Sequence, residues 1–180
     1  MRQVTLLAAG GTISSVEGAS GRPGAAPGLD AAALSAGLEL EARSVLTVPG
    51  PQLTNADALT LAREALSESD RGRGVVITSG TDTIEEVAAL CDVLCGDGAP
   101  IVVTGAMRPA DAPGADGPAN IRDAVAAAAS DQTEGFGGLV CFAGELHAGR
   151  AGRFHGVPPH GDRRVAGTVG RNAHRAADDR

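Results

Sequence analysis

Three short stretches of the sequence place hydroxyl and carboxylate side chains directly after apolar runs. In the first, "LLAAGGTISS" (6–15), the apolar run ends at Gly10 and Gly11, and Thr12 follows with its hydroxyl available. Glycines let a backbone turn tightly and approach a ligand closely. Thr12 is therefore a candidate site residue, and a plain turn after a strand is the alternative interpretation.

The second stretch, "ITSGTDTIEE" (77–86), leads from an apolar run through Gly80 into a helical pattern. Thr81 and Asp82 stand at the expected helix start, where threonine and aspartate are favoured as caps. The same residues also suit catalysis, because Asp82 can hold a substrate ammonium group and Thr81 can supply a hydroxyl. Backbone amides at a helix start stabilise negative charge. Capping and catalysis both remain open here.

The third stretch, "VTGAMRPADAPGADGPAN" (103–120), breaks an apolar run at Gly105 and continues as a long loop before the next helix. Long loops inside compact domains are uncommon unless they are functional. Arg108 either binds a carboxylate or pairs with Asp111 or Asp116, and the structural pair is the preferred interpretation. This loop is the third candidate segment of a site.

The apolar pattern predicts strands that alternate with helices along the chain. Strands are expected at 3–9, 38–48, 74–80, 99–105 and 137–144, and helices at 54–69, 82–95 and 118–130. This alternation is typical of an α/β protein with a parallel sheet and helices on both faces. Ligands of such sheets bind beyond the carboxyl ends of the strands. The three chemical stretches all follow strands, so we expect them to converge.

Composition restricts the function classes. The 180 residues suffice for one domain, and aromatic residues make up 2% with no Trp and no Tyr, so the core must be aliphatic. A formal net charge of −7 argues against nucleic acid or an anionic membrane as a partner. No segment approaches the ~18 apolar residues of a membrane span. A small-molecule substrate is the expected partner.

Compartment and metal content are also constrained. The first apolar run breaks at Gly10 and Gly11 before any cleavage-like region, so we expect no signal peptide and a cytoplasmic location. The cysteines, Cys91, Cys95 and Cys141, have the number and spacing of neither a disulfide framework nor a zinc site. We expect buried free thiols, no metal and no cofactor.

The three stretches carry a family resemblance. In this order, "AAGGTIS", "TSGTDTIEE" and "VTGAMRPADAPGADGPANIRDAV" resemble the signature segments of the L-asparaginase/glutaminase family, of the bacterial type with a threonine nucleophile. The likeness runs from about residue 3 to about residue 148, across that family's N-terminal domain. It implies that residues 1–148 form a flavodoxin-like catalytic domain. It also implies hydrolysis of the side-chain amide of asparagine, and of glutamine where the pocket admits it.

The resemblance assigns roles to particular residues. By similarity, Thr12 attacks the amide carbon and forms an acyl-enzyme that water releases as aspartate. Thr81 and Asp82 match the family's second threonine and its aspartate. Substrate binding falls to Gly80 of the same motif, to Ala106, where the family places backbone near the amide, and to Gln52. Gln52 lies in "VPGPQLTNAD", which resembles the loop that binds the substrate's α-carboxylate and amino group.

The sequence departs from the family pattern at several positions in and beside the signature segments. The threonine that usually precedes the glycine pair is Ala9, and the histidine that usually precedes Gly-Thr-Asp is Ser79. Neither Gly50 nor Pro51 can donate the side-chain hydrogen bond of the family's carboxylate-binding serine. The tyrosine that helps to activate the nucleophile has no counterpart, because the sequence contains no Tyr.

The family's proton-relay lysine is also without a counterpart. The matching segment, "RAGRFHG", places Arg153 or Phe154 at that position, and all 15 basic residues of the sequence are Arg. Arginine does not deprotonate in proteins, so it cannot shuttle protons. Loss of an acid–base partner typically lowers the rate by about 10²- to 10⁴-fold. We therefore expect an impaired hydrolase.

The segment 149–180 is rich in Arg, Gly, His and Pro, and it keeps no helical or strand period. It is expected to be disordered or translated out of frame. The family's C-terminal domain, which helps to assemble a homotetramer, has no counterpart, so a truncated chain with compromised assembly is expected. Two other functions stay open. One is a non-catalytic domain that binds asparagine or aspartate through Asp82 and Gln52, and the other is an ammonia-supplying subunit of a larger amidotransferase.

Overall fold

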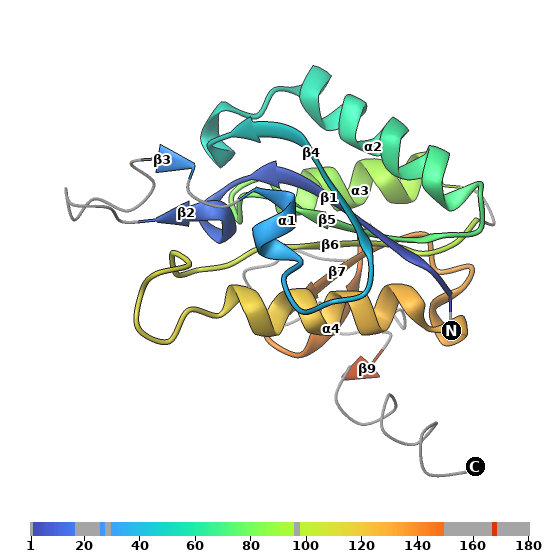
Figure 1. The fold of residues 1–180 in the computed structure, drawn as a ribbon. Helices are drawn as coiled ribbons and strands as arrows, with labels where there is room; N and C mark the ends of the chain where they lie inside the picture. The colour runs from blue at the N-terminus through green and yellow to red at the C-terminus, as the bar shows by residue number, and fades with distance from the viewer. Residues whose placement is uncertain (1, 17–25, 28–29, 96–97, 150–166, 169–180) are drawn as a thin grey trace, which may run out of the picture.

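Parallel strands form the centre of the sheet in the computed structural model, which describes residues 2–16, 26–27, 30–95, 98–149 and 167–168 (Figure 1). The parallel strands are β4 (Glu41–Val48), β1 (Val4–Gly10), β5 (Gly74–Thr78), β6 (Ile101–Thr104) and β7 (Gly138–Phe142), in that spatial order. Antiparallel β8 (Glu145–Ala148) and β9 (Gly167–Thr168) extend the β7 side. A separate short pair joins β2 (Ser15–Val16) to β3 (Ala26–Pro27).

The order of the parallel strands identifies the topology. Numbered along the chain, these strands lie in the order 2-1-3-4-5, which is the flavodoxin-like arrangement. The predicted α/β fold with a parallel sheet is therefore confirmed. The direction of strand addition reverses between β1 and β5, and ligands of doubly wound sheets bind at such a switch point. The loops that follow β1 and β5 contain the first two chemical stretches.

Helices cover both faces of the sheet, as predicted. On one side lie α2 (Asn55–Ser69) and α3 (Ile84–Leu94), and on the other lie α1 (Ala31–Leu34) and α4 (Gly117–Ala129). Figure 1 shows α2 and α4 on opposite sides of the sheet. The period of two in each strand creates this division, because neighbouring side chains point to opposite faces.

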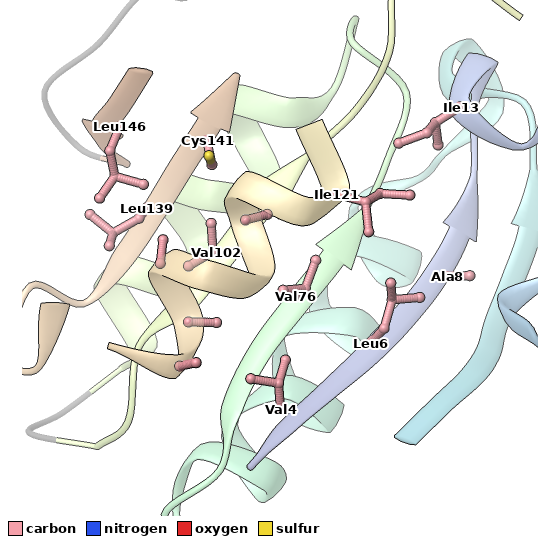
Figure 2. Close-up of a cluster of buried hydrophobic side chains, with 14 of the residues drawn as sticks. Val4, Leu6, Ala8, Ile13, Val76, Val102, Ile121, Leu139, Cys141 and Leu146 are labelled. Carbon is pink, nitrogen blue, oxygen red and sulfur yellow. The ribbon is translucent and has the colours of Figure 1, made fainter. Parts of the chain in front are cut away.

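The α4 side of the sheet carries an aliphatic core. Leu6, Val76 and Val102 of three adjacent strands pack there with Ile121 of α4 (Figure 2). Their strand neighbours Leu7, Val75, Ile77, Ile101 and Val103 form a second core beneath α2 and α3. The central strands are buried on both faces, so their sequences are continuous apolar runs rather than alternating ones.

Local signals determine where the helices begin. At α2, the Thr54 hydroxyl accepts a hydrogen bond from the Asp57 amide (3.2 Å), and the Asp57 carboxylate accepts one from the Thr54 amide (2.9 Å). This reciprocal capping box satisfies two amides that a helix start leaves unpaired.

The C-terminal segment 149–180, expected to be disordered or out of frame, lies largely outside the described residues, at 150–166 and 169–180. Within it, Gly167–Thr168 pairs with β8.

The cysteines occupy packed positions. Cys91 and Cys141 are buried, Cys95 is half-buried, and all three are free thiols. Burial raises the pKa of Cys91 and of Cys141 to about 12, so both thiols stay protonated at neutral pH. Within the described ranges, no group of three metal-binding side chains is gathered. No helix among these residues has the length and hydropathy of a membrane span.

Candidate active site

The loop after β1 presents Thr12 at the carboxyl edge of the sheet. Gly10 and Gly11 have φ values of +94° and +83°, a conformation that favours glycine. A Cβ on Gly11 would lie 2.5 Å from the backbone nitrogen of Gly80, so only glycine allows the two backbones to touch. The Ser15 hydroxyl donates to the Gly11 carbonyl (2.9 Å) and secures the turn. Thr12 follows as a half-buried residue at the start of a 3₁₀ turn.

The loop after β5 leaves Thr81 and Asp82 out of helix capping. The N-cap of α3 is Thr83, and its side chain makes no capping hydrogen bond to the helix. Instead, the Thr83 hydroxyl lies 3.4 Å from the Gly80 carbonyl. Among the described residues, the side chains of Thr81 and Asp82 make no hydrogen bond or ion pair. The capping interpretation is therefore wrong for both side chains.

The loop after β4 packs directly against Asp82. A Cβ on Gly50 would lie 2.1 Å from the Asp82 Oδ1 atom, and a Cβ on Gly80 would lie 2.6 Å from the Gly50 Cα. A side chain at position 50 would therefore displace the Asp82 carboxylate from its present place. Gln52 ends the short 3₁₀ turn Gly50–Gln52, with an exposed side chain.

The loop after β6 completes the group. A Cβ on Gly105 would lie 2.8 Å from the Ser79 carbonyl oxygen and 3.4 Å from the Thr81 Cγ2 atom. The Ser79 amide donates to the Thr104 carbonyl (2.9 Å), which joins the ends of β5 and β6. Ala106 is buried. Its methyl side chain has no polar atom, so only its backbone can form a hydrogen bond to a ligand.

These contacts bring four loops together at the switch point. The glycines at 11, 50, 80 and 105 allow the close approaches, and the six residues expected at the site lie on these loops: Thr12, Gln52, Gly80, Thr81, Asp82 and Ala106. The arrangement places the two threonine hydroxyls and the Asp82 carboxylate at one edge of the sheet. Such a set suits nucleophilic attack on a substrate that carries a positive charge.

Two parts of the region differ from the sequence interpretation or lie beyond it. The Arg108 guanidinium donates to the Pro113 carbonyl (3.0 Å), whereas Asp116 accepts the backbone N–H of Arg108 (3.0 Å). The expected link between Arg108 and Asp116 is thus made by the main chain. The residues expected opposite the family's lysine, Arg153 and Phe154, lie outside the described residues.

Sequence reasoning missed Asn120. Its side chain is buried on α4 and makes hydrogen bonds to Gly105 and Ala143, which belong to different loops. The signal that could have revealed it is the spacing of Asp116 and Asn120, which places both side chains on one face of the first helical turn. A polar residue at an inward-facing helix position, with an aspartate four residues before it, indicates a buried network of hydrogen bonds.

Comparison with known proteins agrees with this geometry. The family model described as "Asparaginase, N-terminal" matches residues 3–154. A probable L-asparaginase 4 of Schizosaccharomyces pombe is 42% identical over 153 residues, which cover 76% of this chain and 42% of that protein. A probable L-asparaginase of Deinococcus radiodurans is 35% identical over 154 residues, which cover 82% of this chain and 46% of that protein.

A solved structure shares the fold. The crystal structure of a probable cytoplasmic L-asparaginase from Campylobacter jejuni matches with a TM-score of 0.72 and 27% identity, over 84% of this chain and 47% of that one. The chain therefore spans less than half the length of the relatives it matches. With the family model covering most of the sequence, the chain belongs to the asparaginase family and contains its N-terminal domain.

Proposed function

We propose that this domain catalyses hydrolysis of the side-chain amide of L-asparagine, with Thr12 as the nucleophile. The observation that carries the proposal is the contact between Gly11 and Gly80, because it brings the Thr12 loop against the loop of Thr81 and Asp82. Membership of the asparaginase family supports the same reaction. A cytoplasmic location and a compromised form of the family's homotetramer belong to the proposal as well, and the Campylobacter relative named as cytoplasmic supports the former.

The proposed reaction proceeds in two steps. The Thr12 oxygen bonds to the amide carbon, its proton passes to the amide nitrogen, and the carbon–nitrogen bond breaks to release ammonia. Water then attacks the resulting ester, releases aspartate and restores the threonine hydroxyl. The Asp82 carboxylate pairs with the substrate's α-ammonium group, and the Thr81 hydroxyl hydrogen-bonds the reacting amide. The backbone at Ala106 lies beside the amide, and Gln52 contacts the α-carboxylate and amino group.

The sequence contains few side chains that could activate the nucleophile by taking its proton. It contains no Lys and no Tyr, and threonine hydroxyls are poor bases at neutral pH. We therefore propose that turnover is slower by about 10²- to 10⁴-fold than in a hydrolase with a complete proton relay. Binding of the substrate depends on Asp82 and Gln52 instead, so we expect binding to be retained more fully than the rate.

The test measures ammonia released from L-asparagine, with L-glutamine in parallel, by the unaltered chain and by two variants. Thr12→Ala is expected to lower asparagine hydrolysis to the uncatalysed level. Thr60→Ala is the matched control, because that exposed threonine donates to the Ala56 carbonyl of its own helix (2.9 Å) and its loss should leave the rate unchanged. Asparagine binding without ammonia release, or a rate that Thr12→Ala does not lower, would contradict the proposal and favour a binding domain.

A further inference from the structure

Three hydrogen-bond donors converge on the carboxylate of Asp116. They are the backbone N–H groups of Met107 and Arg108, each at 3.0 Å, and the side-chain amide of Asn120 at 3.1 Å. Asp116 is the N-cap of α4, yet it makes no capping hydrogen bond within the helix. An N-cap aspartate ordinarily accepts from the amides of the first turn. Here the carboxylate serves the loop after β6 instead.

Asn120 extends this network to two further segments. Its amide nitrogen donates to the Gly105 carbonyl (2.9 Å), and its amide oxygen accepts from the Ala143 amide (3.1 Å). Asn120 is 2% exposed, so these bonds form away from water. Ala143, in the turn between β7 and β8, has a φ of +51°, a conformation that is unfavourable for a residue with a Cβ. Asn120 therefore joins the end of β6 to a strained turn.

The network lies between two parts of the candidate active site. A Cβ on Gly117 would lie 3.0 Å from the Ile13 Cγ1 atom and 3.5 Å from the Ala106 Cβ. The loop after β6 is also tied to the Thr12 segment, because the Ala110 amide donates to the Ser15 carbonyl (2.9 Å). The first turn of α4 thus contacts both the nucleophile's segment and the backbone that faces the substrate amide.

We propose that Asp116 and Asn120 are positioning residues, which fix the backbone of Gly105–Arg108 so that Ala106 is held at a set place beside the substrate amide. The place of Ala106 beside a substrate amide rests on the proposed function. The fixing of the loop backbone by Asp116 and Asn120 does not rest on it. The chemistry is specific, because all three groups that meet Asp116 are donors and only a carboxylate offers an acceptor on both oxygens. An asparagine there would direct its NH₂ group at another donor.

The loop is tested by amide hydrogen exchange in the full chain, read at Met107 and Arg108. Asp116→Asn is expected to lower the protection of these amides about tenfold, which is the worth of one hydrogen bond to a charged group. The matched control is Thr133→Val, in the turn that follows the C-terminal end of the same helix, where the hydroxyl donates to the Ala127 carbonyl (2.7 Å). If both variants change the two amides equally, the effect is one of general stability and the positioning role is wrong.

The second measurement is L-asparagine affinity at pH 8 and pH 5, expressed relative to the unaltered chain. Asn120→Asp removes the donor to Gly105 and places a second carboxylate beside Asp116, so we expect affinity to fall about tenfold at pH 8. Two adjacent carboxylates share a proton as the pH falls, which replaces the hydrogen bond between residues 120 and 116 but not the donor to Gly105, so we expect partial recovery at pH 5. A weakening that is the same at both pH values, or that Thr133→Val reproduces, would overturn the role.

The two proposals fail in different ways. If the unaltered chain neither binds nor hydrolyses L-asparagine, the proposed function is wrong, and the exchange of Met107 and Arg108 still decides whether Asp116 and Asn120 control the loop. If the chain binds L-asparagine and the Asp116→Asn and Asn120→Asp variants behave as Thr133→Val does, the positioning proposal is wrong and the proposed function stands.

Discussion

At the scale of single residues, two threonines on neighbouring strands differ in whether their buried hydroxyls have a hydrogen-bond partner. Thr78 and Thr104 are paired across β5 and β6, and both are fully buried. The Thr104 hydroxyl donates to the Cys141 carbonyl (2.7 Å). The Thr78 hydroxyl has no hydrogen-bond partner within the described part of the chain. Burying a polar group without a partner costs free energy that an apolar group of the same shape avoids.

The two threonines should therefore respond oppositely to valine. We expect Thr78→Val to raise the free energy of unfolding by about 1 kcal/mol, because it removes an unpaired hydroxyl. Thr104→Val should lower it by about 1 kcal/mol, because it leaves the Cys141 carbonyl without its donor. Urea unfolding followed by far-UV circular dichroism measures both, since a chain without Trp or Tyr has little intrinsic fluorescence. Destabilisation by both substitutions would show that the Thr78 hydroxyl has a partner after all.

At the scale of secondary-structure elements, a buried carboxylate joins α2 to the first strands. Glu68 of α2 is 2% exposed and receives hydrogen bonds from Arg73 (3.2 Å), Arg71 (2.7 Å), Arg43 (3.3 Å) and Thr5 (3.3 Å). Burial raises the pKa of Glu68, but the hydrogen bond from Arg73 and the charges of Arg71 and Arg43 outweigh it, so the pKa lies below its ordinary value. The network lies at the amino end of the sheet, opposite the candidate site.

This lowered pKa predicts the pH at which the network fails. A carboxyl group whose pKa is depressed on folding stabilises the protein above its unfolded-state pKa of about 4.3, and the contribution is lost as pH falls through the folded value. At pH 7, Glu68→Gln should lower the free energy of unfolding by about 1.5–3 kcal/mol, the range for hydrogen bonds to charged groups. Melting temperatures measured from pH 7 to pH 3 should show the difference from the unaltered chain shrinking below about pH 4.

An exposed glutamate supplies the control. Glu64 pairs with Arg43 at 2.9 Å, but its side chain is 45% exposed, so Glu64→Gln should cost less than about 1 kcal/mol at any pH. Equal effects of the two substitutions would mean that burial of Glu68 does not strengthen its ion pairs. A Glu68→Gln difference that persists undiminished at pH 3 would mean that the loss is one of packing rather than of charge.

The sequence predicted the elements well because their signals are local. Apolar runs located β1, β5 and β6, and the Thr54–Asp57 spacing located the start of α2. The contacts that assemble the candidate site are not local, because Gly11 meets Gly80 only after β1 has paired with β5, which is distant in the sequence. The same limit explains why Thr81 and Asp82 looked equally like caps. The helix starts two residues later than expected, so neither side chain caps it, and propensity does not resolve such a shift.

At the scale of the whole molecule, one sheet separates two aliphatic cores. Ile121 belongs to the core beneath α4, and Ile77 belongs to the core beneath α2 and α3. The cores have no buried member in common, yet β1, β5, β6 and β7 contribute alternate side chains to both, as Leu6 and Leu7 of β1 do. Loss of order in a strand therefore disrupts both cores. This coupling through the strands predicts that the described domain unfolds as a single cooperative unit.

Conservative deletions on the two faces test this prediction. Ile77→Val and Ile121→Val each remove one buried methylene group, so each should lower the free energy of unfolding by about 0.5–1.5 kcal/mol. The side chains lie on opposite faces of the sheet, so the double variant should show the sum of the two effects within about 0.5 kcal/mol. Urea titrations should give one transition with an unchanged dependence on urea in all variants. Two separate transitions, with only one moved by each substitution, would mean that the two faces unfold independently and that the sheet does not transmit the loss of one core to the other.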